Sequence, residues 1–164
     1  GIGSASRLVP CDGKGYTIGA ILMSNFGMPG NLMIDGRRID TENKAPKSKV
    51  EKGSTIIIIA TDIPLNERQL KRVSKRATVA LSRTGSFIGN GSGDIAIAFS
   101  NTNIVPHYSK KNIIETKMFH DDAMDKVFEA TAEVVEEAII SSIYHAETVK
   151  GIRGNEVFGL REFL

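Results

Sequence analysis

The stretch "EKGSTIIIIATD", residues 51–62, decides the fold. Its four consecutive isoleucines form a β-branched run of strand length, which predicts a buried strand. A charged lead-in around Glu51, which we expect to be flexible, reaches Gly53 and then Ser54. The hydroxyl therefore stands at the first position of a rigid strand, directly after a residue without a side chain. The chemistry that such a hydroxyl could perform is the main functional question of the sequence.

Length and composition restrict the class of protein. A chain of 164 residues fits one domain, and 41% apolar with 24% charged residues is typical of a globular protein. The net charge of +2 is too small to favour nucleic acid or an anionic membrane as a partner. No apolar run approaches the length of a membrane helix. Cys11 is the single cysteine, which fits a reducing compartment, so we expect a cytoplasmic protein.

The segments on either side of the isoleucine run predict strands and a basic helix. Residues 16–27 end in Asn-Phe-Gly and are typical of a strand that enters a turn. Residues 28–52 have neither helical nor strand periodicity, so we expect a long exposed connection. Asn66 is a candidate N-cap of a helix that ends at Gly85. The inner face of that helix carries apolar residues at helical spacing: Leu70, Val73, Ala77 and Leu81.

A second long helix is predicted over about residues 121–148, with an acidic outer face. Between the two helices, residues 95–103 form an apolar strand with small alternate residues. Two long helices and several apolar strands indicate a layered α+β domain. Whether the basic and the acidic helix lie side by side stays open at this point. The predicted inner face of the second helix consists of Met124, Val127, Phe128, Val134, Val135, Ala138, Ile139 and Ile143.

The glycine cluster "GNGSGD", residues 89–94, does not predict a nucleotide site. A phosphate-binding glycine loop follows a strand and opens a helix, whereas this one leads into a strand and lacks a Walker lysine. We interpret it as a tight turn that uses the tolerance of glycine for positive φ. The turn would hold the hydroxyl of Ser92 and the carboxylate of Asp94 in fixed directions. His107, His120 and His145 lack metal-ligand spacing, so the sequence predicts no metal and no cofactor.

Cleavage before Ser54 would give its hydroxyl an activating base without a second side chain. A serine hydroxyl is a poor nucleophile until a base takes its proton. The α-amine freed by the cut has an ordinary pKa of about 7.7–8.0, which suits a general base. Gly53 would allow the strain and the close approach that attack on its own carbonyl requires. A turn followed by a strand remains the simple alternative for this pattern.

Five segments in order resemble the DmpA-type aminopeptidases, a family of L-aminopeptidase/D-amidase/D-esterases and β-peptidyl aminopeptidases. They are "GIGSASR", "YTIGAILMSNFG", "GSTIIIIATDIPLNERQLKRVSKRATVALSRTGS", "GNGSGDIAIAFS" and "EEAIISSIYHAETVKG". The resemblance implies an αββα sandwich of the N-terminal-nucleophile-like type shared with ornithine acetyltransferases. It also implies a precursor that cuts itself before a serine, and an enzyme that releases the N-terminal residue of short peptides, amides or esters.

The resemblance assigns roles to particular residues. It implies that Ser54 is the nucleophile, that the cleavage site is Gly53–Ser54, and that Asn25 donates to the oxyanion. Ser92 and Asp94 correspond to the second serine and the carboxylate around the nucleophile, although some members carry glutamate at the latter position. We expect one domain over residues 1–164. Residues 1–53 then end the α-chain region, with an exposed linker over 28–53, and residues 54–164 form the β-chain region.

Family precursors have a sizeable region before "GIGSASR", so this chain is expected to hold only part of the sandwich. The expected partners are that N-terminal part, a short peptide, amino-acid amide or ester substrate, and further αβ units in a homo-oligomer, with no nucleic acid and no membrane. Two alternatives stay open. One is an ornithine acetyltransferase-like acyl transferase, in which Thr55 would be the threonine nucleophile. The other is an inactive fragment that serves as a structural subunit.

Overall fold

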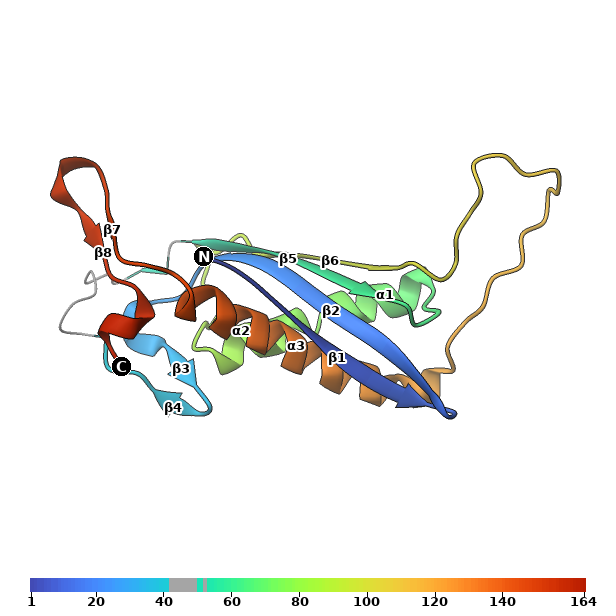
Figure 1. The fold of residues 1–164 in the computed structure, drawn as a ribbon, viewed down its shortest axis with the longest axis horizontal. Coiled ribbons are helices and arrows are strands. Elements are labelled where there is room, and N and C mark those ends of the chain that lie inside the picture. Colours follow the sequence, from blue (N-terminus) through green and yellow to red (C-terminus); the bar gives the residue numbers. More distant parts are fainter. Residues whose placement is uncertain (42–49, 52) are drawn as a thin grey trace.

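A four-stranded mixed sheet in the order β1-β2-β5-β6 forms the centre of the computed structural model, which describes residues 1–41, 50–51 and 53–164 (Figure 1). Strand β2 (Lys14–Asn25) pairs antiparallel with β1 (Ile2–Cys11) and with β5 (Ser54–Thr61), and β6 (Ile95–Ser100) runs parallel to β5. Strand β1 was not predicted. Its signal is Asp12-Gly13, which adopts positive φ at both residues and forms the two-residue turn of a β-hairpin.

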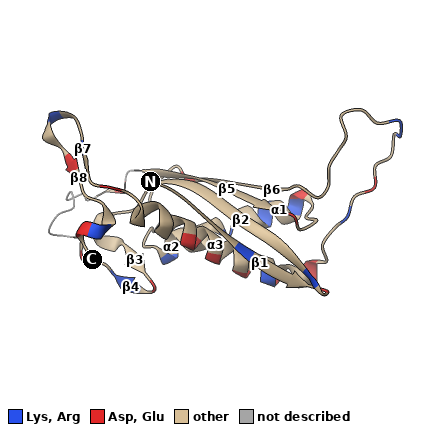
Figure 2. Cartoon of the chain, in the orientation of Figure 1, with Lys and Arg blue, Asp and Glu red and all other residues tan. Residues whose placement is uncertain are grey.

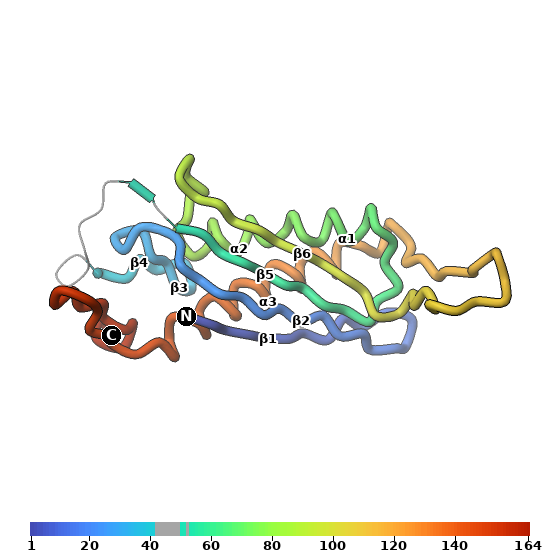
Figure 3. The backbone as a smooth tube through the Cα atoms, turned by 90° about the horizontal axis from the view of Figure 1, so that it is seen from above, coloured from blue at the N-terminus to red at the C-terminus, as the bar shows by residue number. Residues whose placement is uncertain are grey.

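The helices cover one face of this sheet (Figure 3). Helices α1 (Glu67–Ser74) and α2 (Ala77–Arg83) connect β5 to β6, and α3 (Met124–Tyr144) packs along β1 and β2. The core between sheet and helices is aliphatic and fully buried, with Ile18, Ile57, Ile59, Val127 and Val134 at its centre. Within the part of the chain that the structure describes, no helix has the length and hydropathy needed to cross a bilayer.

On the other face of the sheet, large apolar side chains stay exposed in the part of the chain that the structure describes. Successive residues of a strand point to opposite faces, so every second side chain of β2, β5 and β6 lies there. One sheet with one helical layer is half of the predicted αββα sandwich. In a sandwich, the inner face of a second sheet would cover these side chains. They are Ile21, Met23, Ile56, Ile58, Ile95, Ile97 and Phe99, all more than a third exposed.

The described residues within 28–53 differ from the predicted exposed linker. The described part of this segment holds a 3₁₀ turn (Pro29–Asn31) and a short hairpin of β3 (Met33–Ile34) and β4 (Arg37–Arg38). Thr41 and Glu51 in the same segment are buried. Residues 42–49 and 52, which were also included in the linker, lie outside the described residues.

The remaining small elements come directly before α3 or after it in the sequence. The 3₁₀ turn Asp121–Ala123 leads into α3, and a hairpin of β7 (Val149–Lys150) and β8 (Glu156–Val157) follows it. Two further 3₁₀ turns, Ile152–Gly154 and Leu160–Glu162, complete the C-terminal part. Figure 1 shows the β7–β8 hairpin at one end of the molecule and the long connection after β6 projecting from the other.

Both predicted helices form, with shorter limits. Asn66 is the N-cap of α1 and makes a full capping box with Gln69. The sequence predicts a single helix from there to Gly85, but the structure has two helices that are interrupted at residues 75–76. Neither of these two residues is a glycine or a proline, so the interruption has no sequence signal. The second predicted helix, over residues 121–148, begins as a 3₁₀ turn, and its α-helical part ends at Tyr144. Its predicted inner face is buried apart from Phe128 and Ile143, which are half-buried.

The basic and the acidic helix do lie side by side, as the distribution of charge in Figure 2 shows. Arg83 of α2 contacts Glu136 of α3 at 3.0 Å. On the other side of α3, Arg7 of β1 contacts Glu133 at 3.4 Å. These pairs are partly exposed to solvent, so each contributes little to the free energy of folding. Complementary charge nevertheless favours this placement of the elements over one that would bring like charges together.

Both carboxylate oxygens of Asp121, just before α3, accept hydrogen bonds from side chains of α1. Arg68 donates to its Oδ2 atom, and the Gln69 amide donates to Oδ1 at 2.7 Å. The hydrogen bond from Arg68, followed by that from Gln69 and by the nearby positive charges, lowers the pKa of the Asp121 carboxyl below its ordinary value. A carboxyl whose pKa is lowered in the folded state stabilises the fold above its unfolded pKa and loses that contribution as the pH falls.

We therefore expect Asp121→Asn to lower the free energy of unfolding at pH 7. The difference from the wild type should narrow as the pH falls below about 4, where the unfolded carboxyl becomes protonated. Urea unfolding of both proteins at pH 7 and pH 3 measures the two differences. A difference that is equal at both pH values would contradict this account of Asp121.

Candidate active site

Ser54 begins β5, and its hydroxyl lies against the peptide bond that precedes it. Ser54 Oγ donates to the carbonyl oxygen of Gly53 at 2.7 Å. The Gly93 N–H lies between these two oxygens, at 3.2 Å from Ser54 Oγ and 3.3 Å from the Gly53 oxygen. Ser54 is exposed on the open face of the sheet. A hydroxyl and an amide donor therefore converge on a single carbonyl group at the edge of the uncovered face.

Close packing explains the glycine at position 53 better than backbone strain does. Its φ is not among the positive values of the described residues, so the resting backbone shows no strain at this glycine. A Cβ atom at this position would lie 2.0 Å from the carbonyl oxygen of Asn25, so no other residue fits without a shift of the backbone. Gly53 also pairs with Ser92 in an isolated β-bridge. The residue before Ser54 is thus confined between the end of β2 and the glycine loop.

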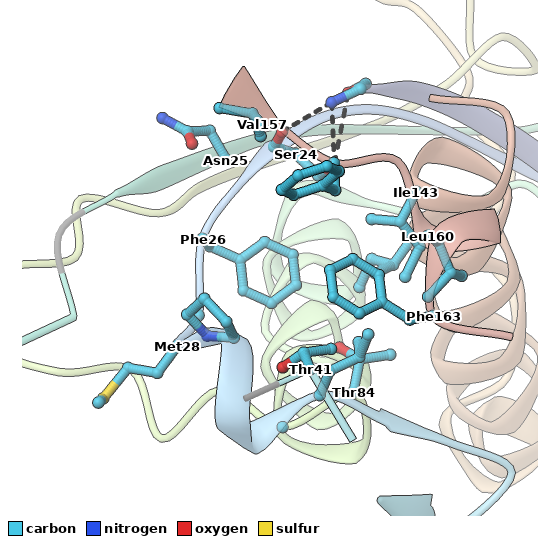
Figure 4. Close-up of a pocket in the computed structure, with 17 residues that line it drawn as sticks. Ser24, Asn25, Phe26, Met28, Thr41, Thr84, Ile143, Val157, Leu160 and Phe163 are labelled. Atoms are coloured by element: carbon cyan, nitrogen blue, oxygen red, sulfur yellow. Dashed lines mark hydrogen bonds between the residues drawn. The ribbon is translucent and has the colours of Figure 1, made fainter. Parts of the chain in front are cut away.

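Asn25 lies directly opposite Ser54. It is the last residue of β2, and the antiparallel register pairs it with Ser54 across the ladder. Side chains at opposite positions point to the same face, with Cβ atoms roughly 4.5–5.5 Å apart. Figure 4 shows the Asn25 amide pointing away from the neighbouring apolar pocket. The structure therefore brings the predicted amide donor beside the predicted nucleophile.

Ser92 and Asp94 form a pair on the loop that carries Gly93. The Ser92 hydroxyl donates to Asp94 Oδ2 at 2.7 Å. The other carboxylate oxygen of Asp94, Oδ1, is buried and has no hydrogen-bond partner among the described residues. Within this described part, neither side chain hydrogen-bonds to Ser54, and the loop reaches that hydroxyl through the Gly93 backbone. A buried acceptor without a donor is costly and is available for a new partner.

The glycines of this loop let other residues approach its backbone closely, and they do not adopt positive φ. The interpretation of the loop as a turn that needs glycines with positive φ is therefore wrong. None of Gly89, Gly91 and Gly93 has positive φ, whereas Ile88 does, with φ 54°. A Cβ atom on Gly93 would lie 3.1 Å from Ser54 Oγ, and one on Gly91 would lie 2.6 Å from the Glu51 carbonyl oxygen. Ser54 and the Glu51 carbonyl can therefore approach the loop backbone directly.

Two neighbours of Ser54 differ from their sequence-based interpretations. Thr55 is fully buried and faces the helices, away from Asn25 and Ser54. This position does not favour a threonine nucleophile at Thr55. Glu51, expected in a flexible lead-in, is only 2% exposed. Nothing in its local sequence predicts this burial, because its hydrogen-bond partners lie far away in the chain.

An apolar pocket of about 360 Å³ adjoins the end of β2 (Figure 4). Phe26, Phe158 and Phe163 line it together with residues of α3, and Ser54 is not among its lining residues. The pocket is thus separate from the hydroxyl. In the described ranges 1–41, 50–51 and 53–164, no three His, Cys, Asp or Glu side chains are grouped as metal ligands would be.

Two β-peptidyl aminopeptidases are similar to this chain in sequence. The β-peptidyl aminopeptidase BapA of Sphingosinicella microcystinivorans is 35% identical over 170 residues, which covers 94% of this chain and 43% of that protein. The enzyme of the same name from Sphingosinicella xenopeptidilytica is 31% identical and covers 98% of this chain and 44% of that protein. The chain therefore spans less than half the length of these relatives.

Solved structures agree with the sequence comparison. A Pyrococcus horikoshii OT3 protein shares 48% identity with a TM-score of 0.88, over 98% of this chain and 44% of that one. The L-aminopeptidase D-Ala-esterase/amidase of Ochrobactrum anthropi shares 35% identity with a TM-score of 0.87, and the match covers 97% of this chain and 44% of that one. That structure is described as a variant of the Ntn hydrolase fold. The predicted α+β, Ntn-hydrolase-like fold is thereby confirmed for this part of the sandwich. The model of peptidase family S58 matches residues 1–157, and the chain belongs to that family.

Proposed function

We propose that the complete protein is a self-processing aminopeptidase or amidase that acts through an acyl-enzyme on Ser54. The observation that carries this proposal is the contact of the Ser54 hydroxyl with the Gly53 carbonyl at 2.7 Å, with the Gly93 N–H directed at both oxygens. A hydroxyl that only capped a strand would not need the second donor.

In the proposed self-cleavage, Ser54 Oγ attacks the Gly53 carbonyl carbon. The Gly93 N–H stabilises the negative charge on the Gly53 oxygen. The C–N bond breaks, its nitrogen takes up the proton of the hydroxyl, and an ester links Gly53 to Ser54 Oγ. Water then hydrolyses the ester, which leaves a Gly53 carboxylate and a free Ser54 α-amine. The attack uses groups that are already in contact: the Ser54 hydroxyl, the Gly53 carbonyl and the Gly93 N–H.

In the mature enzyme, the Ser54 amine takes the hydroxyl proton while Oγ attacks the substrate carbonyl. Asn25, which projects from the position opposite Ser54, donates to the oxyanion. The amine then returns the proton to the leaving group, and water hydrolyses the acyl-enzyme. The buried Oδ1 of Asp94, which has no donor among the described residues, accepts a hydrogen bond from the new ammonium group, and Ser92 relays a proton.

Two relatives are β-peptidyl aminopeptidases and one is an aminopeptidase with esterase and amidase activity, and these names support a proposal for the substrate class. We propose short peptides, amino-acid amides or esters with a free amine. The rest of the complete protein supplies the second sheet, because the open face exposes aliphatic residues such as Ile56, Ile58 and Ile97. Such αβ units then assemble into a homo-oligomer in the cytoplasm.

Replacing the nucleophile should abolish both reactions. We expect Ser54→Ala in the complete protein to stay uncut and to hydrolyse no amino-acid p-nitroanilide, because the attacking atom is missing. The matched control is Ser82→Ala, an exposed serine on α2, which should cut and hydrolyse like the wild type. Gel analysis and p-nitroaniline release measure the two reactions. Hydrolysis by the Ser54→Ala protein would contradict the assignment.

Removal of the proposed oxyanion donor should act on kcat. We expect Asn25→Ala to lower kcat by roughly 10²- to 10³-fold, the usual effect of losing one such donor. KM should change little, because the interaction strengthens only as charge develops on the oxygen. Steady-state kinetics of the mature variant test this expectation. A rise in KM at unchanged kcat would instead place Asn25 in substrate binding.

The proposed contact of Asp94 with the ammonium group predicts a shift in the pH profile. A carboxylate beside the Ser54 amine raises the pKa of that amine, and the amine must be neutral to act as a base. We therefore expect Asp94→Asn to move the rising, acidic limb of kcat/KM to lower pH. Initial rates between pH 5 and 9 measure the limb. A limb that stays at the wild-type pH would separate Asp94 from the amine.

A further inference from the structure

Glu51 is a buried carboxylate that accepts three hydrogen bonds from described residues in separate parts of the site. Its Oε1 accepts from the Gly27 N–H at 3.1 Å and from the Ser86 hydroxyl at 2.6 Å. Its Oε2 accepts from the Gly89 N–H at 3.0 Å. Burial of an unpaired carboxylate would be very unfavourable, so these donors are what allow Glu51 to be buried.

The three donors lie on two segments that border the candidate site. Gly27 lies two residues after Asn25, at the end of β2. Ser86 and Gly89 lie on the loop that leads to Gly93. Glu51 itself stands three residues before Ser54, on the segment that enters the scissile peptide bond. A single side chain therefore connects the segments that carry the oxyanion donor, the amide donor and the reacting carbonyl.

The loop of residues 86–89, which donates to Glu51, has a strained backbone at Ile88. The strain indicates that the hydrogen bonds to Glu51 impose the shape of this loop. Ile88 has φ 54°, an unfavourable value for a β-branched residue. The Ser86 hydroxyl that donates to Glu51 also accepts from the Ile88 N–H at 3.0 Å. A Cβ atom on Gly89 would lie 3.1 Å from Glu51 Oε2. Strain of this kind persists only where surrounding contacts hold it, and it is common at functional sites.

We infer that Glu51 is a positioning residue for self-cleavage. It fixes the segment before Ser54 against the loop, so that the Gly53 carbonyl stays between the Ser54 hydroxyl and the Gly93 N–H. Glu51 touches neither reacting atom. It acts by holding the backbone of the segments that carry those atoms and the Gly93 N–H. The inference rests on the proposed function, because it assumes a cut before Ser54. After the cut, Gly53 is a product end, and the influence of Glu51 on the reaction becomes small.

The test measures the self-cleavage rate of the complete protein after cell-free synthesis, by intact mass against time. We expect Glu51→Gln to slow cleavage by roughly 10- to 100-fold, the cost of misplacing reacting groups by about 1 Å. The matched control is Glu129→Gln, an exposed glutamate on α3, which should cut at the wild-type rate. Hydrolysis per cleaved Glu51→Gln molecule should fall far less than the cleavage rate does. A purely structural defect would lower both together with the melting temperature.

A second pair of variants keeps the test decisive if Glu51→Gln does not fold. Ser86→Ala removes one donor to Glu51 and should slow cleavage, and Ser86→Thr restores the hydroxyl and should restore the rate. The inference is wrong if folded Glu51→Gln cuts as fast as Glu129→Gln, or if Glu51→Gln is insoluble and Ser86→Ala cuts at the wild-type rate. A wild-type protein that stays uncut would overturn the proposed function itself and this inference with it.

Discussion

The register of the central strand β5 is the constraint on which the site depends. β5 is bonded to β2 on one side and to β6 on the other, so its position along both neighbours is fixed. This register places Ser54 opposite Asn25, and the bridge of Gly53 to Ser92 brings the Gly93 N–H to the same carbonyl. A slip of one residue would turn Thr55 to the open face and bury Ser54. The buried Ile57 and Ile59 oppose such a slip, because it would expose both of them.

The same alternation connects the site to the architecture of the complete protein. Ser54 and Asn25 point to the face of the sheet that the helices do not cover, and the aliphatic side chains of β2, β5 and β6 point there too. The chain spans less than half the length of its relatives, and its sheet has one covered and one open face. The hydroxyl thus lies at the edge of the surface that a second sheet of a sandwich would bury. Both the shielding of the site from water and the shape of a substrate pocket would depend on that second layer.

Local sequence patterns predicted the elements that obey one clear periodicity. The isoleucine run, the strand that ends at Asn25 and the inner faces of the helices follow directly from side-chain spacing. The β1–β2 hairpin was missed although Asp12-Gly13 is its signal. The burial of Glu51 and the break between α1 and α2 had no local signal. Glu51 is buried by donors at Gly27, Ser86 and Gly89, and contacts at such separations arise only once the sheet has formed.

The most direct measurement uses hydroxylamine, which intercepts esters faster than water does. The complete protein is allowed to process itself in hydroxylamine, and the chain ends are identified by mass spectrometry. We expect a new chain that begins at Ser54 and a Gly53 end that carries a hydroxamate, since the acyl group passes through the serine oxygen. A single uncut chain, or a cut at another bond, would contradict this expectation.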